Sequence, residues 1–162
     1  MKALHTILYI VGLVWIVTLH SCTDTLGELP DFKIKKNDQV VEDVNAFIKD
    51  KPAMIVHFDA DCKGCQDEAE GIVKNLQKFG DIKIVFASLQ GFDKIVLFDD
   101  YFQLSAHQNI TVGQDYLNMI PNRFETYTTP LIALIDENSH IRKVITGEIE
   151  MPELIQLLNE IR

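Results

Sequence analysis

The sequence is poor in cysteine and in basic residues, and each shortage excludes a class of protein. Its 162 residues include three cysteines, too few for a disulfide-stabilised scaffold. Lys and Arg number 15 against 24 Asp and Glu, which gives a formal net charge of −9. Binding to nucleic acid needs clustered bases against the phosphates, so neither DNA nor RNA is an expected partner. The hydrophobic fraction of 47% is too high for a disordered chain, and the length suits one domain.

The N-terminal segment also lacks acids, and its only base before residue 22 is Lys2. The run from Ile7 to Leu19 is almost wholly apolar but short for a membrane-spanning helix, which needs about 20 residues. Such a run behind a basic start is typical of a signal peptide. With Leu19 and Ser21 ahead of Cys22, the end of the run resembles a bacterial lipobox, which implies cleavage before Cys22 and its lipidation. The alternative is an uncleaved anchor helix. Both readings place the domain outside the cytoplasm, at a membrane.

The rest of the chain divides into a tether and one folded domain. Residues 22–42 are expected to form the lipidated N-terminus and a polar tether, and residues 43–162 the domain. Hydrophobic periodicity predicts an alternation of helices and strands. The expected helices are 43–49, 62–79, 93–106, 116–126 and 151–161, and the expected strands are 53–58, 82–89, 109–113, 131–135 and 141–145. This order predicts an α/β fold with one central mixed sheet flanked by helices.

The residues that carry chemistry are Cys62-Lys63-Gly64-Cys65, at the start of a predicted helix. A helix N-terminus stabilises the negative charge of a thiolate, which is the nucleophile in thiol chemistry. Cys62 is therefore the expected attacking thiolate, and Cys65, one turn further in, the resolving thiol. Gly64 keeps the turn compact, and Lys63 places a cation beside Cys62. Asp61 is the expected helix cap.

Acidic residues surround the same motif and act against the thiolate. Asp59, Asp61, Asp67 and Glu68 lie within a few positions of the cysteines, and like charge raises a thiol pKa. The sign of the net shift does not follow from the sequence. If the acids dominate, the pair favours reduction of its substrates.

Other uses of a CxxC pair lack their remaining residues here. A structural zinc site needs four ligands, and the chain has no second CxxC and no His pair, since His57 and His107 stand alone. Haem attachment needs a histidine after the second cysteine, where Gln66 stands. A purely structural disulfide stays open, although so short a loop adds little stability.

The domain resembles the thioredoxin fold over about residues 43–162. The resemblance rests on the strand, turn, CxxC and helix unit, on the strand at 82–89, and on Thr129-Pro130 leading into the strand at 131–135. In thioredoxins the corresponding proline is cis and lies against the disulfide. The resemblance thus implies that Pro130 is cis, and that the backbone of Thr129 binds an incoming substrate chain as an added strand.

The chain departs from plain thioredoxin in two places. The turn before Cys62 is one residue shorter and lacks Trp, and His57 lies near the position of thioredoxin's buried acid. Proton transfer to Cys65 could use His57 or a water, or His57 could be an ordinary buried strand residue. About 40 residues separate Leu89 from Pro130, roughly twice the span in thioredoxin. An inserted helix and strand there is similar to the TlpA-like membrane-anchored thiol–disulfide reductases and to peroxiredoxins.

The expected activity is thiol–disulfide exchange on extracytoplasmic protein substrates, in the reducing direction. The resemblance implies electrons from a membrane thiol donor. No metal and no organic cofactor is expected beyond the redox-active Cys62–Cys65 disulfide. The expected location is the bacterial cell envelope, with the lipid anchor facing the periplasm or in the outer membrane. Two alternatives stay open: a thioredoxin-fold module that only binds partner chains, and a thiol peroxidase. The peroxidase is disfavoured because Asp59 replaces the Thr of the peroxiredoxin pattern.

Overall fold

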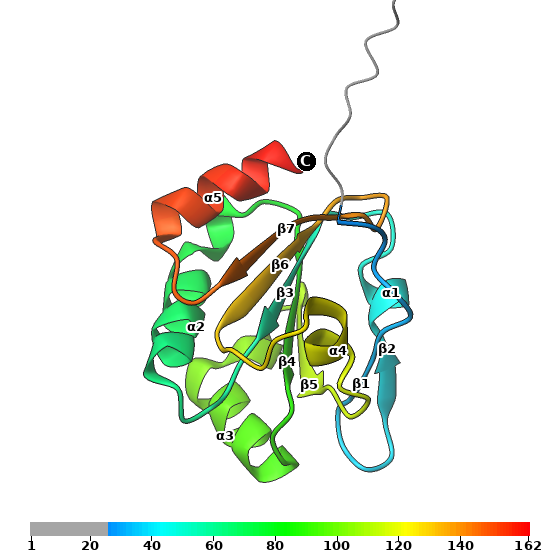
Figure 1. Ribbon diagram of the computed structural model, residues 1–162. Helices are drawn as coiled ribbons and strands as arrows, with labels where there is room; N and C mark the ends of the chain where they lie inside the picture. Colours follow the sequence, from blue (N-terminus) through cyan, green and yellow to red (C-terminus); the bar gives the residue numbers. More distant parts are fainter. Residues whose placement is uncertain (1–25) are drawn as a thin grey trace, which may run out of the picture.

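The computed structural model describes residues 26–162 and shows a seven-stranded sheet with helices on both faces (Figure 1). The predicted signal peptide and Cys22 lie outside these residues. The strand order is β2-β1-β5-β4-β3-β6-β7. The strands are β1 Lys33–Lys35, β2 Val41–Asp43, β3 Ala53–His57, β4 Lys83–Ser88, β5 Ile110–Gln114, β6 Leu131–Ile135 and β7 Ile141–Thr146. The α-helices are α1 Val44–Phe47, α2 Lys63–Asn75, α3 Phe92–Phe102, α4 Met119–Phe124 and α5 Met151–Glu160.

The directions of the central strands gather the loops of the site at one edge of the sheet. β3 runs parallel to β4, and β4 parallel to β5, whereas β6 runs antiparallel to β3. The carboxyl ends of β3 and β4 therefore meet the amino end of β6. The register pairs His57 with Leu131, which places the segment after His57 beside Pro130. The predicted central mixed sheet is confirmed.

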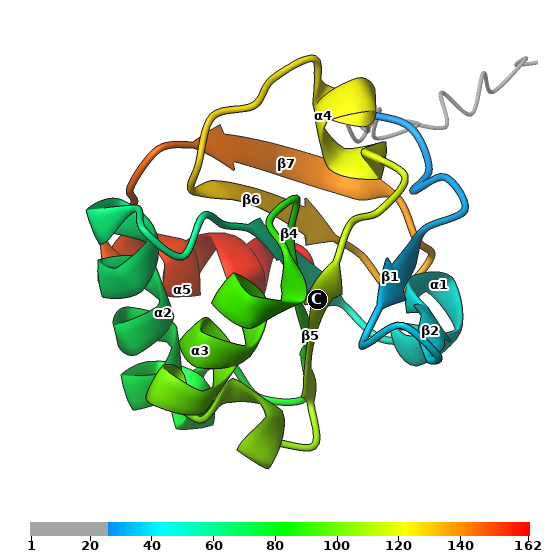
Figure 2. The same cartoon turned by 90° about the horizontal axis from the view of Figure 1, so that it is seen from below.

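Two apolar clusters, one on each face, hold the sheet between its helices. α2, α3 and α5 cover one face, and α1 and α4 the other (Figure 2). On the first face Phe58 stacks on Phe98 with ring centroids 4.3 Å apart. Phe58 is 1% exposed and comes just before the turn that leads to Cys62. The packing of Phe58 therefore fixes the start of that turn.

The folded part of the chain begins earlier than the sequence predicts. β1 and β2 pair with each other within the segment expected to be a tether, and β1 also pairs with β5. Ile34 is fully buried, and Phe32 beside it is 1% exposed. Each strand has three residues, too few for an alternating pattern to stand out from a polar sequence. The tether prediction for this part of the chain is wrong.

The predicted helices are longer than those in the structure. α1 has four residues, and the helix expected up to residue 106 ends at Phe102, followed by a 3-10 turn over Leu104–Ala106. α4 begins at Met119, so Pro121 lies in its first turn, where a missing N–H is tolerated. The segment between β4 and Pro130 holds α3, β5 and α4, as the predicted insertion requires.

Candidate functional site

Cys62 is itself the N-cap of α2. Its sulfur accepts a hydrogen bond from the backbone N–H of Cys65 at 3.3 Å, and its backbone is extended. The prediction that Asp61 caps this helix is wrong, because that carboxylate instead pairs with Lys94 at 2.9 Å. A thiolate on Cys62 would meet the unpaired N–H groups and the positive end of the helix dipole. The side chain is partly exposed, so another molecule can reach its sulfur.

Cys65 lies behind Cys62, in the core cluster of α2. It is 1% exposed, and its sulfur accepts a hydrogen bond from the backbone N–H of Asp59 at 3.5 Å. Burial, together with the neighbouring Cys62 sulfur, raises the pKa of the Cys65 thiol to about 12. Both cysteines are free thiols in this structure. The arrangement therefore has one accessible sulfur and one sheltered sulfur, as the sequence predicts for an attacking and a resolving thiol.

The peptide bond between Thr129 and Pro130 is cis, as the resemblance implies. The Cys62 thiol donates to the carbonyl oxygen of Thr129 at 3.7 Å. Tyr127 and Thr128 are exposed ahead of it, so a strand could approach this backbone from solvent. The structure thus brings Cys62, Cys65, Thr129 and Pro130 together at one edge of the sheet.

Side chains that the sequence does not single out hold the turn before Cys62. Gln90, after β4, accepts from the N–H of Ala60 at 2.7 Å. Gln66, on α2, donates to the carbonyl of Ala60 at 2.8 Å. The Lys94–Asp61 ion pair joins the same turn to α3. Gln90 and Lys94 are about 30 residues away in sequence, so only the register of the sheet could have revealed them.

His57 ends β3 and is 2% exposed. Its Nδ1 lies 3.1 Å from the carbonyl of Ala87, so Nδ1 carries the proton and donates. Burial lowers the pKa of His57, against the opposing effect of that bond and of Asp115. The ring is therefore neutral at pH 7 and held by the sheet. No hydrogen bond joins it to Cys65 within the described residues, so its part in proton transfer stays a prediction.

The acidic side chains around the motif differ in their partners and in their burial. Lys63 is exposed and pairs with Asp67, one turn along α2, and this pair raises the pKa of Lys63. The Asp59 carboxylate accepts from the N–H of Asp61 at 2.8 Å. Glu68 is 4% exposed, and burial raises its pKa to about 7. Since Lys63 contacts Asp67, its proposed influence on Cys62 stays a prediction.

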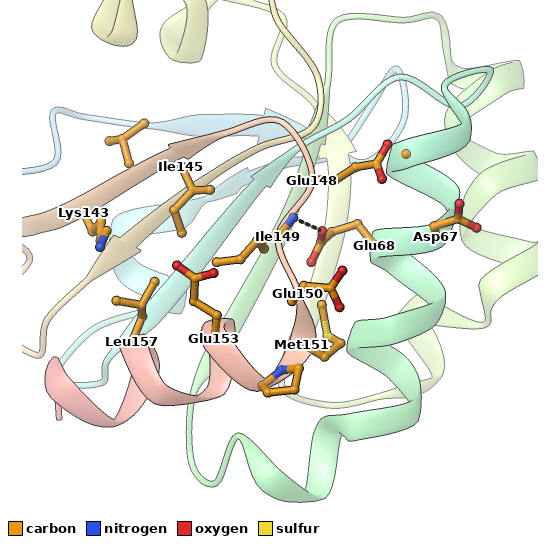
Figure 3. A pocket seen from close by; sticks show the side chains of 13 residues that line it. Asp67, Glu68, Lys143, Ile145, Glu148, Ile149, Glu150, Met151, Glu153 and Leu157 are labelled. Carbon is orange, nitrogen blue, oxygen red and sulfur yellow. Dashed lines mark hydrogen bonds between the residues drawn. The ribbon is translucent and has the colours of Figure 1, made fainter.

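A cavity of about 590 Å³ borders the motif on the side of Gly64 (Figure 3). Its walls come from α2, the end of β7, the following loop and the start of α5. Glu148, in that loop, lies over Gly64, where an added Cβ would be 2.5 Å from a carboxylate oxygen. The sequence gives no sign that Glu148 is near the motif, because more than 80 residues separate the two.

Two kinds of feature are absent from residues 26–162. This part of the chain has no cluster of three or more His, Cys, Asp and Glu side chains arranged to hold a metal ion. It also has no helix with the length and apolar character needed to cross a membrane.

Comparison with solved structures identifies the fold. No protein-family model and no curated protein sequence matches the chain. MTB DsbF, in mixed oxidised and reduced forms, superimposes with a TM-score of 0.70 at 18% identity, covering 82% of this chain and 96% of that one. A secreted Mycobacterium tuberculosis disulfide oxidoreductase homologous to E. coli DsbE gives 0.66 at 15%, covering 80% and 96%. A thiol-disulfide isomerase from Corynebacterium glutamicum gives 0.64 at 18%, covering 83% and 96%. The chain therefore has the thioredoxin-like fold that these thiol–disulfide proteins share.

Proposed function

We propose that the protein is a thiol–disulfide oxidoreductase that reduces disulfides in extracytoplasmic proteins. The observation that carries the proposal is the pair itself: an accessible Cys62 that caps α2, a buried Cys65 behind it, and the Thr129 carbonyl 3.7 Å from the Cys62 sulfur. The names of the similar structures, DsbF and a DsbE homologue among them, agree with this chemistry.

The reaction proceeds in two exchanges. The Cys62 thiolate attacks one sulfur of the substrate disulfide, forms a mixed disulfide and releases the other substrate sulfur as a thiolate. Cys65 then loses its proton and attacks the Cys62 sulfur, which frees the second substrate sulfur and leaves a Cys62–Cys65 disulfide. Two electrons and two protons pass to the substrate. A thiol donor at the membrane restores the two thiols by the reverse exchanges.

The burial of Cys65 supports the reducing direction. A strongly oxidising pair has a reduced form stabilised as a thiolate. Here burial and the neighbouring Cys62 sulfur hold Cys65 as a thiol. The reduced pair therefore gains little from a thiolate on Cys65. A reduced form with little stabilisation favours donation of its electrons to a substrate disulfide.

Trapping of mixed disulfides tests the proposal. In cells, a Cys65→Ala variant should accumulate mixed disulfides with partner proteins, because the resolving thiol is missing. A Cys62→Ala variant should trap none, and the unchanged protein should reduce insulin. If neither variant traps a partner and the unchanged protein does not reduce insulin, the chain is a binding module. Peroxide consumption by the reduced protein would instead indicate a peroxidase.

We further propose that Cys22 is lipidated and anchors the domain at the outer side of a bacterial membrane. Support comes from the sequence before Cys22 and from the secreted relative of known structure. Mass spectrometry of the mature N-terminus tests it. The mature chain should begin at Cys22 with lipid on its sulfur and on its amino group, and a chain that begins at Met1 with an unmodified Cys22 would contradict the proposal.

A further inference from the structure

The turn between β3 and α2 supplies a backbone donor to the buried resolving thiol. The N–H of Asp59 donates to the Cys65 sulfur at 3.5 Å. Burial and the Cys62 sulfur raise the pKa of the Cys65 thiol to about 12, and this N–H is the largest effect that lowers it. A hydrogen bond to a charged group stabilises the charge, so the N–H favours the thiolate that Cys65 becomes in the second exchange. The direction of one peptide group in the turn therefore affects the resolving step.

Two glutamine side chains hold this turn through Ala60, the residue after Asp59. Gln90, after β4, accepts from the N–H of Ala60 at 2.7 Å, and Gln66, on α2, donates to its carbonyl at 2.8 Å. Ala60 is partly buried and carries only a methyl group, so its own side chain cannot hold the backbone by a hydrogen bond. The packing of Phe58 fixes the chain before Asp59, and the glutamines fix it afterwards. Together they limit how far the Asp59 N–H can turn away from the resolving sulfur.

Gln90 is itself fixed by the ends of two strands. Its backbone N–H donates to the hydroxyl of Ser88, the fully buried last residue of β4, at 3.2 Å. Its backbone carbonyl accepts from the side chain of Gln114, the last residue of β5, at 3.0 Å. Its side-chain nitrogen lies 3.5 Å from a carboxylate oxygen of Asp61, which leaves Oε1 for Ala60. The sheet therefore sets the position of Gln90, and Gln90 passes this constraint on to the turn.

The attacking thiol has hydrogen bonds of its own. The Cys62 sulfur accepts from the N–H of Cys65, within the first turn of α2, and the thiol donates to the Thr129 carbonyl. Neither bond involves Ala60 or the two glutamines. A change at Gln90 should therefore act on the second exchange and leave the first nearly unchanged, a split that a general loss of structure would not produce.

We propose that Gln90 is a positioning residue for the resolving step, because it holds the turn in the conformation that directs the Asp59 N–H at the Cys65 sulfur. The inference rests on the proposed function, of which the resolving step is a part. Gln66 supports the same conformation through the other backbone group of Ala60. Both glutamines act through the backbone of the turn.

A small aromatic disulfide separates the two exchanges in time. One equivalent of dithiobis(nitrobenzoic acid) is mixed with the reduced protein, and the coloured thiolate is followed. The Cys62 thiolate attacks one sulfur and releases the first thiolate. Cys65 then gives its proton to water, attacks the Cys62 sulfur and releases the second, which leaves a Cys62–Cys65 disulfide. Gln90→Met keeps the side-chain length and removes the acceptor. It should slow the second release about tenfold, the effect of about one hydrogen bond, and leave the first within about twofold.

Gln156→Met is the matched control, an exposed glutamine on α5 that bonds Glu160 of the same helix, and it should change neither release. Gln66→Met should also slow the second release, and it carries the same test should Gln90→Met not fold. The double variant should slow this release by less than the product of the two single effects, because both side chains hold Ala60. The proposal is wrong if the glutamine variants slow both releases equally, or if Gln156→Met has the same effect as Gln90→Met.

The same measurements separate this inference from the proposed function. Two releases in the unchanged protein, with an unaltered second release in both glutamine variants, would overturn the positioning role and leave the reductase standing. The expected slowing without any reduction of insulin by the unchanged protein would support the positioning role and overturn the reductase. A single release in the unchanged protein would mean that Cys65 does not resolve the mixed disulfide, which overturns both.

Discussion

At the scale of the residue, the two cysteines of one motif differ in exposure and in ionisation. Cys62 caps a helix and is reachable from solvent, whereas Cys65 is 1% exposed with a pKa raised to about 12. The pattern of the sequence predicts this order of roles, because the first cysteine of a helix-start CxxC lies at the exposed end. The extent of burial of Cys65 could not be predicted from the motif, because it depends on the packing of residues outside the motif.

Alkylation should reveal this difference directly. At pH 8, iodoacetamide should modify Cys62 and leave Cys65 intact, because a thiol with a pKa near 12 is ionised in only about one molecule in ten thousand. A peptide mass map locates the modification. The Cys62→Ala variant should show no modification of Cys65 at the same pH. Comparable labelling of both cysteines would refute the assigned burial.

Glu68 should make stability depend on pH. Its pKa in the folded protein is about 7, above the ordinary value of 4.5, so its contribution to stability is full below pH 4.5 and is lost as the pH rises to about 7. Glu68→Gln should therefore raise the free energy of unfolding at pH 8, on the order of 3 kcal/mol, and change it little at pH 4. Urea denaturation at both pH values measures this.

The control for Glu68 is Glu70→Gln, an exposed acid on the same helix. It should change the free energy of unfolding by well under 1 kcal/mol at either pH. An equal gain for both variants, or a gain for Glu68→Gln that is the same at pH 4 and pH 8, would show that burial of Glu68 is not the cause.

At the scale of the element, β1 has to approach β5 very closely. A Cβ on Gly113 in β5 would lie 2.7 Å from the backbone oxygen of Lys35 in β1. Gly113→Ala should therefore push β1 away and destabilise the fold by about 1–3 kcal/mol, the usual effect of overpacking. Urea denaturation again gives the measurement.

Gly71→Ala is the matched control for Gly113→Ala. Its added Cβ would meet the flexible side chain of Met151 at 3.1 Å, and alanine favours the helix. It should leave the protein as stable as before or slightly more stable. If Gly113→Ala is equally harmless, β1 does not pack on β5 as described.

The same elements show what the sequence could and could not predict. β3 and β6 have five buried residues each, and such apolar runs are visible in the sequence. β1 and β2 are short and mostly polar, so their place follows from pairing partners that lie far away in sequence. The cysteines belong to a motif of fixed spacing, and Thr129-Pro130 directly precedes an apolar strand, so both could be predicted. Gln90 and Glu148 could not, since they reach the motif only through the register of the sheet and the path of a loop.

At the scale of the whole molecule, the described chain starts at the end of the sheet opposite to Cys62 (Figure 1). The N–H of Leu26 binds the carbonyl of Ile141, where β7 begins, whereas Thr146 at the other end of β7 pairs with Leu131 beside His57. The five residues of β6 span roughly 17 Å between these two ends. If Cys22 is lipidated as proposed, we expect the cysteine pair to face away from the membrane.

This orientation predicts free access to Cys62 in the anchored protein. A charged, membrane-impermeant thiol reagent should modify Cys62 at the same rate in lipidated protein on vesicles and in a Cys22→Ala form in solution. A tenfold slower reaction on vesicles would mean that the membrane covers the site.

The reduction potential of the Cys62–Cys65 pair distinguishes a reductase from an oxidase. Purified protein is equilibrated in dithiothreitol buffers of graded potential, and its free thiols are counted. We expect one two-electron transition near the thioredoxin value, about −270 mV. A transition near about −120 mV would make the pair an oxidant, and the absence of any transition would remove the redox function altogether.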